Sequence, residues 1–136
     1  MKRSLKDKVV WITGAGSGIG QNAAKTLSSL GMNVILSGRD EEKLKLTANQ
    51  CVNEAKIEPL DVSEYEQVEK VSLEIIKEFK KIDILINSAG TNVEHRDWDV
   101  INKRDWDNIF QTNVNGLFYC CKSILPYMKQ QKDGLI

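Results

Sequence analysis

The fold is decided by the stretch VVWITGAGSGIG, residues 9–20. Its first four residues are apolar, which is typical of a strand buried on both faces of a parallel sheet. The glycines that follow let the backbone turn tightly into a helix. Such a loop leaves free N–H groups at the positive end of a helix dipole, where a phosphate can bind. The alternative is an ordinary tight turn, but the position of the loop after the first strand of a β-α-β unit favours phosphate binding.

Apolar runs and helical patterns alternate along the chain. Runs rich in Val, Ile and Leu occupy residues 9–12, 33–36, 57–60 and 82–86. Between and after them, apolar residues recur at helical spacing in four stripes: Ile19, Ala23, Ala24, Leu27 and Leu30; Leu44, Ala48, Cys51, Val52 and Ala55; Val68, Val71, Ile75 and Phe79; and Trp106, Ile109, Phe110, Val114, Leu117, Phe118 and Cys121. This alternation, joined by right-handed crossovers, predicts an α/β fold: a Rossmann-like, doubly wound parallel sheet with strand order 3-2-1-4.

Several residues predict where these elements begin and end. Gly31 can take the left-handed conformation that closes the first helix. Ser63 and Glu66 have the spacing of a capping box that opens the third helix, and Pro126 is expected to kink or end the last one. The final residues, 134–136, resemble the start of a fifth buried strand. We therefore expect residues 1–136 to form a single domain that is truncated, and so incomplete, at its C-terminus.

Charge and composition narrow the class of protein. The chain has 19 basic and 19 acidic residues, without a long block of like charge, so we expect neither nucleic acid nor an anionic membrane as a partner. The N-terminus is polar, and no apolar run has membrane-spanning length. Three cysteines, two of them adjacent, are expected to be reduced thiols. These features together predict a cytoplasmic protein.

Four short motifs give the chain a family resemblance. They occur in order: Thr13-Gly14-x-x-x-Gly18-Ile19-Gly20, Asp61-Val62, Asn87-Ser88-Ala89-Gly90 and Asn113-Val114-Asn115-Gly116. In this respect the chain resembles the short-chain dehydrogenase/reductases over residues 8–136. Its one small departure is Ser88, where the family most often has a second Asn. The resemblance implies an NAD(P)-binding Rossmann domain and an oxidoreductase that transfers hydride between nicotinamide and an alcohol or carbonyl substrate.

The resemblance also assigns cofactor-binding residues. The phosphate loop would contribute Gly14, Ser17, Gly18, Ile19 and Gly20. Asp61 would bind the adenine amino group, assisted by the backbone of Val62. Asn87, Ala89 and Gly90 would pass under the ribose and steady the sheet. Asp61 could also serve as a turn former before a helix, alone or alongside binding.

Cofactor preference is predicted by the end of the second strand. By resemblance, Gly38 stands at the acidic position of NAD-preferring members and Arg39 at the basic position of NADP-preferring members. Because Arg can pair with a 2′-phosphate, the cofactor is expected to be NADP, with NAD less favoured. The alternative for Arg39 is a solvated loop charge. Asp40 is expected to cap the second helix and to take no part in binding.

Asn113 is the one catalytic residue that the resemblance assigns within the chain. Its family role is to hold a water that links the active-site lysine to solvent. We expect it to be buried in the apolar helix, where an ordered water could satisfy its amide. The alternative, which the sequence leaves open, is a structural Asn that satisfies backbone groups.

The family's other catalytic residues are a serine and a Tyr-x-x-x-Lys pair. Here Tyr65, Tyr119 and Tyr127 are followed at the fourth position by Glu69, Ser123 and Gln131. We therefore expect this chain alone to bind cofactor weakly, to lack turnover, and to aggregate or associate through an uncovered sheet edge. The complete protein should use a small-molecule alcohol or ketone and form a homo-oligomer. The alternative is a non-catalytic dinucleotide-binding or interaction module.

Other residues predict little chemistry. His95 is the only histidine and lies in a polar loop, so a solvated side chain is expected and no metal site. Trp98 and Trp106 are open to two interpretations, as the lining of a substrate entrance or as core or interface packing.

Overall fold

A computed structural model describes residues 4–136 and contains a parallel sheet of four strands in the order β3-β2-β1-β4. The strands are β1 (Val9–Thr13), β2 (Asn33–Ser37), β3 (Lys56–Ile57) and β4 (Ile84–Asn87). Strand β1 is central, and its Trp11 lies opposite Ile35 on one side and Leu85 on the other. The predicted doubly wound parallel sheet is confirmed.

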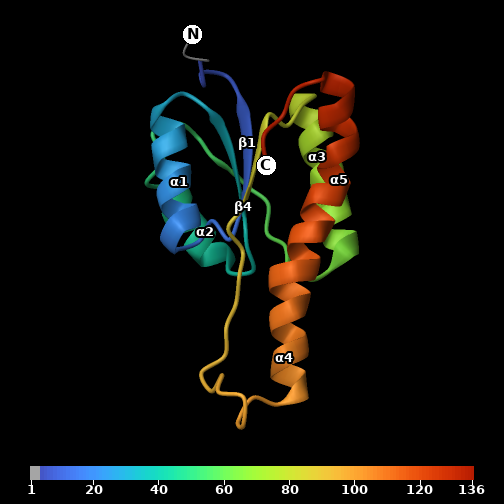
Figure 1. Cartoon of the computed structure of the whole chain (residues 1–136). Helices are drawn as coiled ribbons and strands as arrows, with labels where there is room; N and C mark the ends of the chain where they lie inside the picture. The colour runs from blue at the N-terminus through green and yellow to red at the C-terminus, as the bar shows by residue number, and fades with distance from the viewer. Residues whose placement is uncertain (1–3) are drawn as a thin grey trace.

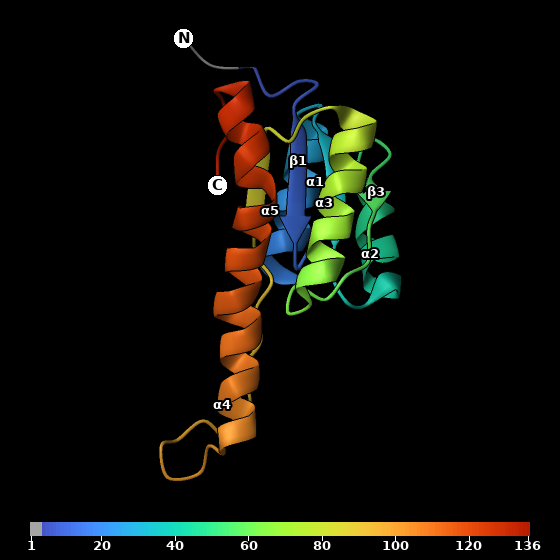
Figure 2. The same ribbon diagram turned by 90° about the vertical axis from the view of Figure 1, so that its right-hand side faces the viewer.

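Helices cover both faces of this sheet. They are α1 (Gly18–Ser29), α2 (Glu41–Ala48), α3 (Tyr65–Phe79), α4 (Lys103–Phe110) and α5 (Gly116–Gln131). Figure 1 shows α1 and α2 on one face and α3 and α5 on the other. A π-helical turn, Gln111–Asn115, joins α4 to α5, and α4 extends well past the sheet (Figure 2).

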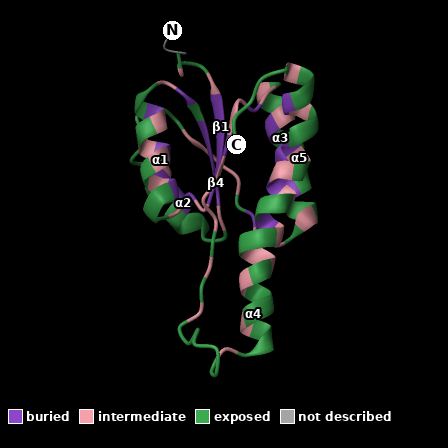
Figure 3. Ribbon diagram, in the orientation of Figure 1, coloured by how far each residue is buried: buried purple, intermediate pink, exposed green. Residues whose placement is uncertain are grey.

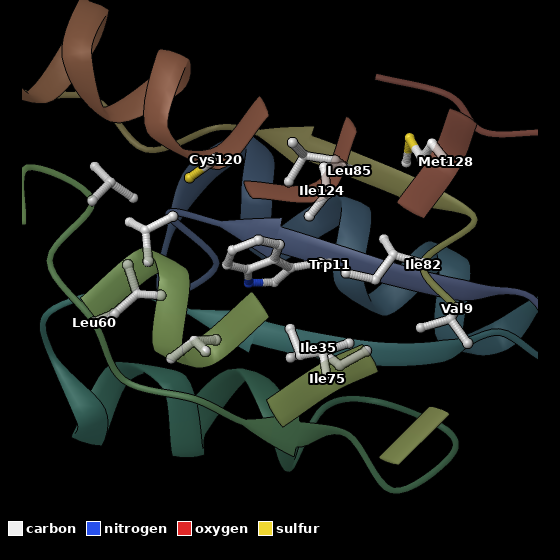
Figure 4. Packing of buried hydrophobic residues seen from close by; sticks show 13 residues of the cluster. Val9, Trp11, Ile35, Leu60, Ile75, Ile82, Leu85, Cys120, Ile124 and Met128 are labelled. Carbon is white, nitrogen blue, oxygen red and sulfur yellow. The ribbon is translucent and has the colours of Figure 1, made fainter. Parts of the chain in front are cut away.

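The core has one layer on each face of the sheet. Strand β1 sends Val9 and Trp11 into the layer under α3 and α5, and Val10 and Ile12 into the layer under α1 and α2. This period-two alternation, with every residue of the strand buried, is what an inner strand of a parallel sheet requires. Figure 4 shows Trp11 in the middle of the first layer. Its indole N–H donates to Ser37 Oγ at 2.9 Å, so the buried donor is satisfied.

Strand β3 is shorter than the predicted run 57–60. It pairs with β2 only over Lys56–Ile57. The N–H groups of Glu58 and Leu60 still donate to β2 and the residue after it, at 2.9 and 3.0 Å. Pro59 stands between them, where the backbone N–H of an edge strand would face away from β2, so a residue without an N–H is tolerated there.

The stripes predicted for the first two helices need correction. Ile19 is 81% exposed and Leu30 half exposed, so α1 buries Ala24 but neither end of its stripe. Helix α2 ends at Ala48, and the chain continues through turns in which Val52 is exposed. The period of apolar residues identified these helices, but it did not reveal which positions the sheet would cover.

The predicted buried face of the last two helices, α4 and α5, is wrong. Helix α4 has no buried residue, and α5 buries Gly116, Cys120, Ile124 and Met128 at a spacing of four (Figure 3). The predicted stripe is instead largely exposed, including Trp106, Phe110, Val114, Leu117 and Phe118. Gly116 allows the start of α5 to lie against the segment before α3, because a Cβ at Gly116 would stand 2.6 Å from Val62 Cγ2. Pro126 does not end the helix, since packing on either side of it at Ile124 and Met128 holds the helix through to Gln131.

Predictions about element ends had mixed outcomes. Gly31 has φ +84° directly after Leu30, the C-cap of α1, as predicted. The capping box is wrong: α3 begins after Glu64 without a side-chain cap from the described residues, and Ser63 Oγ donates to Asp61 at 2.7 Å instead. Leu135 pairs in parallel with Ile84, as the start of a fifth strand requires, but Leu135 and Ile136 are exposed, so the expectation that this strand is buried is wrong.

Two further structural facts bear on the class of protein. Over residues 4–136, no helix combines the length and the apolar character needed to cross a bilayer. The three cysteines are free thiols. Burial raises the pKa of the Cys120 thiol to about 12, so this group stays protonated and inert at neutral pH.

Asp83 holds together the strand ends opposite those that carry the glycine loop. Its carboxylate accepts from Lys8 Nζ and from the Val9 N–H, both at 2.8 Å, and lies 3.2 Å from Lys81 Nζ. Burial of this side chain, which is 10% exposed, acts to raise the pKa. The hydrogen bonds outweigh burial and hold the pKa of Asp83 below its ordinary value.

Asp83 therefore makes stability depend on pH. Because its pKa is lower in the folded state, its contribution is present above the unfolded value of about 3.9 and is lost as pH falls through the folded value. We expect Asp83→Asn to lower the free energy of unfolding near neutral pH by about 1.5–3 kcal/mol and to flatten the acid limb of the stability profile. Urea unfolding across this pH range checks it, with exposed Asp99→Asn as control. Equal stability of Asp83→Asn and wild type at neutral pH would contradict the assignment.

Candidate functional site

An open cleft lies where the carboxyl ends of β1, β2 and β4 meet. Its volume is about 170 Å³. The lining residues come from the loops after these strands, from the segment after β3 and from α2 and the π-helical turn: Gly14, Gly16, Ser17, Gly38, Arg39, Asp40, Lys43, Leu44, Leu60, Asp61, Val62, Ala89, Gly90 and Thr112. In open parallel sheets, ligands bind at this edge, where neighbouring strands lead to opposite faces.

The N-terminus of α1 is left available at this cleft. Ser17 is its N-cap, with an extended backbone, and none of the described side chains caps the helix. No acidic residue occupies its first turn. By contrast, α2 is capped by Asp40 and α4 by Asn102. Free N–H groups and an uncompensated helix dipole make the start of α1 suited to an anion.

Glycine is required at different positions of this segment for different physical reasons. A Cβ at Gly20 would stand 2.4 Å from Gly14 O, and one at Gly14 would stand 2.6 Å from Ala89 N. These two glycines let backbone segments touch. Gly18 has φ +55°, yet a Cβ there would meet no atom of residues 4–136 within 4 Å apart from its chain neighbours and the adjacent backbone of α1. The space beside Gly18 is therefore open at the start of α1.

Arg39 and Asp40 follow β2 at the rim of the cleft. Arg39 is exposed, and within residues 4–136 its guanidinium has no ion-pair or hydrogen-bond partner. Asp40 caps α2 by accepting from the Lys43 N–H at 3.1 Å, as predicted. Arg39 thus presents an uncompensated positive charge beside the cleft, while the neighbouring carboxylate is engaged by the helix.

Asp61 serves as a turn former, as one interpretation predicted. Its Oδ1 accepts from the Ser63 N–H at 3.0 Å and from Ser63 Oγ at 2.7 Å. Asp61 also lines the cleft together with Val62, whose side chain is buried against the core. The carboxylate has a second oxygen, so the turn does not exhaust its capacity to accept hydrogen bonds.

The motif at the end of β4, residues 87–90, divides into two parts. Ala89 and Gly90 line the cleft, and the Ala89 N–H donates to Thr13 Oγ1 at 3.4 Å. Asn87 does not line it: its Nδ2 lies 3.6 Å from Cys121 Sγ, and its buried Oδ1 has no hydrogen-bond partner within the described part of the chain. Of the predicted cofactor-binding residues, the structure brings seven to the lining of one cleft: Gly14, Ser17, Arg39, Asp61, Val62, Ala89 and Gly90. Gly18, Ile19, Gly20 and Asn87 are not among the lining residues.

Asn113 is exposed, and the expectation of a buried side chain is wrong. It lies on the π-helical turn, where its Oδ1 accepts from the Thr91 N–H at 2.7 Å and its Nδ2 donates to Thr91 O at 2.9 Å. The apolar neighbours that suggested burial are themselves exposed or only partly buried. This pairing ties the turn to the segment after Gly90, as the structural interpretation proposed.

The tryptophans and His95 lie outside the cleft. Trp98 and Trp106 pack with ring centroids 5.7 Å apart, and Phe110 continues the stack at 4.8 Å. Trp98 is 86% exposed, so the interpretation that it packs into the core is wrong. Lining of a substrate entrance stays a prediction. His95 is exposed, as expected.

Sequence reasoning missed four side chains that line the cleft: Lys43, Leu44, Leu60 and Thr112. Lys43 lies within α2, and no spacing rule links it to the glycine loop. Thr112 directly precedes the recognised motif that begins at Asn113. The π-helical geometry that brings Thr112 to the cleft has no sequence signal.

Comparisons with known proteins agree with this geometry. The family model described as short chain dehydrogenase matches residues 8–136. An uncharacterized oxidoreductase of Staphylococcus epidermidis is 36% identical over 97% of this chain and 57% of its own length. A metagenomic short-chain oxidoreductase, solved in complex with NADP, superposes with a TM-score of 0.92 at 28% identity, over 98% of this chain and 62% of its own. A short chain dehydrogenase from Bacillus anthracis gives 0.90 at 29%, over 98% and 55%.

The chain therefore belongs to the short-chain dehydrogenase family, as its motifs predicted. It spans a little over half the length of the curated relatives it matches, 57% in the first case. The matched portion contains the whole sheet and the cleft.

Proposed function

We propose that this protein is an NADP(H)-dependent oxidoreductase and that the cleft holds the adenosine and phosphate part of the cofactor. The observation that carries the proposal is one cleft with the free guanidinium of Arg39 beside it and the uncapped start of α1 at its loop. Its volume, about 170 Å³, is below the roughly 300–1,000 Å³ of complete small-molecule pockets. The cleft therefore suits part of a dinucleotide.

The residues present fit such a ligand. The loop at Gly18 and the first N–H groups of α1 would hold the pyrophosphate, with Gly14, Ser17, Ile19 and Gly20 shaping the loop. Arg39 would pair with the 2′-phosphate, and Asp61 with the adenine amino group, assisted by Val62. Ala89 and Gly90 would form the floor under the ribose, and Asn87 would brace β4 behind it.

The reaction proposed for the whole protein is reduction of a small ketone or oxidation of an alcohol. The bound nicotinamide would supply or accept the hydride. Within this chain, Asn113 would hold a water through the remaining lone pair of its Oδ1, in addition to its bonds to Thr91. Because no Tyr-x-x-x-Lys spacing occurs in the 136 residues, we expect this chain alone to bind cofactor without turnover.

Compartment and assembly are part of the same proposal. We infer a cytoplasmic protein from the charge balance and the free thiols. We infer self-association of the complete protein, because α5 presents exposed apolar residues such as Leu117 and Phe118 on the side away from the sheet.

Replacing Arg39 by Asp should weaken NADPH binding and leave NADH binding nearly unchanged. The variant removes a charge-assisted pair, worth about 1.5–3 kcal/mol, or roughly a ten- to hundredfold loss of affinity. Calorimetric titration of both cofactors into both proteins measures it. Arg96→Asp, in the exposed loop before α4, makes the same charge change outside the cleft and should bind as wild type does. Undiminished NADPH affinity in Arg39→Asp would remove the basis for NADP preference.

A further inference from the structure

We propose that Lys43 is a second cation for the 2′-phosphate and, with Arg39, determines the preference for NADP. This inference rests on the proposed function and adds to it a residue that no motif assigns. Lys43 lines the same cleft as Arg39, but it comes from inside α2, whereas Arg39 comes from the end of β2. Two cations from two elements would approach a phosphate from different directions.

The glycine loop and α2 are in close contact at Lys43. A Cβ at Gly16 would stand 3.0 Å from Lys43 Cβ, so the absence of a side chain at position 16 lets the first turn of α2 lie against the loop. The stem of Lys43 therefore starts directly beside the loop proposed to hold the pyrophosphate. Its four-carbon reach can bring the ammonium to a phosphate on the neighbouring ribose.

A buried hydroxyl fixes α2 in this position. Thr47, one turn after Lys43 and fully buried, donates from Oγ1 to Ala15 O of the glycine loop at 3.0 Å. The same oxygen accepts from Gln21 Nε2 of α1 at 3.1 Å. The helix that carries Lys43 is thus hydrogen-bonded both to the phosphate loop and to the helix that follows it, which limits the rearrangement needed on binding.

Asp40 explains how the Lys43 ammonium is held near the cleft yet remains available. Its carboxylate caps α2 through the Lys43 N–H, and its Oδ2 lies 3.6 Å from Lys43 Nζ. Both side chains are more than half exposed, and an exposed pair at this distance contributes about 0–1 kcal/mol. A phosphate carrying nearly two negative charges can therefore compete for the ammonium.

Lys43 could favour NADP in a second way, by neutralising Asp40 and so reducing its repulsion of the phosphate. The two effects separate in an Asp40→Asn background. Asn retains the ability to cap a helix and carries no charge. If Lys43 pairs directly with the phosphate, its removal still weakens binding in that background.

The test is calorimetric titration of the full chain with NADPH, NADH and adenosine 2′,5′-bisphosphate. We expect Lys43→Gln to weaken NADPH and bisphosphate binding by about tenfold, the loss of one charge-assisted contact, in both the wild-type and Asp40→Asn backgrounds. NADH binding should change less than about twofold, since it lacks the 2′-phosphate that Lys43 would contact. Lys45→Gln is the matched control, because Lys45 pairs with Glu41 and Glu42 and does not line the cleft.

The outcomes separate the two proposals. If wild type prefers NADPH and Lys43→Gln keeps the full preference, the role of Lys43 is overturned and the proposed function is not. If Lys43→Gln weakens NADPH binding in the wild-type background but not in the Asp40→Asn background, direct pairing of Lys43 with the phosphate is overturned. Lys43 would then act only by neutralising the charge of Asp40. Wild type that binds neither NADPH nor the bisphosphate overturns the proposed function, and the role of Lys43 with it.

Discussion

Replacement of Gly18 by Asn is expected to reduce NADPH affinity at least about a hundredfold, a loss of about 2.8 kcal/mol, while leaving the fold intact. Gly18 has φ +55°, a conformation that Asn adopts more readily than other residues with a side chain. Residues 4–136 leave open space where the new side chain would project. The substitution therefore places atoms at the start of α1 without a clash inside the protein. A ligand phosphate bound there would have to be displaced.

Titration with NADPH measures this effect, and far-UV circular dichroism with a thermal melt verifies the fold. A folded Gly18→Asn protein that binds NADPH as wild type does would mean that the loop is only a turn between strand and helix. The same titration with NADH should show an equal loss, because the pyrophosphate is common to both cofactors.

Replacement of Gly20 by Ala should have the opposite profile, with a large loss of stability from a single methyl group. The new Cβ would stand 2.4 Å from Gly14 O and 2.9 Å from Gly14 C, both backbone atoms in a segment held between β1 and α1. Neither can rotate away as a side chain would, so the backbone must shift. We expect a loss of about 3 kcal/mol or more in the free energy of unfolding, at the upper end for overpacking.

Urea unfolding of Gly20→Ala beside Gly18→Ala makes the comparison direct. Both add one methyl group within the first turn of α1, but only position 20 has the backbone oxygen of Gly14 in its path. Gly18→Ala should cost only the left-handed backbone conformation, about 1–2 kcal/mol. Equal losses at the two positions would show that the close contact with Gly14 O does not determine the need for glycine.

The sheet could be predicted because its strands carry a strong signal. Every residue of β1 is buried, and the run Val9–Ile12 is apolar throughout, so pattern and burial coincide. The helices were identified by the same means. The buried face was predicted for α3, where Val68, Val71 and Ile75 are buried, but not for α4 and α5. Trp106 and Phe110 have helical spacing with Leu117, yet all are substantially exposed. Periodicity reports that one face of a helix is apolar, and whether another element covers that face depends on tertiary geometry.

The candidate site divides in a similar way. The glycine loop, Arg39 and the segment after β4 follow closely on strands, and Asp61 ends the extended path after β3. Parallel strands place their carboxyl ends at one edge of the sheet. Lys43 and Thr112 follow no strand, so their positions depend on how α2 and the π-helical turn pack. Asn113 was recognised as important, but its partner Thr91 is a backbone group 22 residues earlier in the chain. No local pattern could identify that contact.

The central claim is that the cleft at the end of the sheet binds the adenosine and phosphate part of NADP. The most direct measurement is a map of backbone amide chemical shifts in the full chain during titration with NADP. We predict the largest changes at the glycine loop, residues 14–20, and at Arg39, Lys43, Val62 and Gly90. Changes confined to the outer face of α5 or to the loop before α4, or no saturable changes at all, would contradict the account.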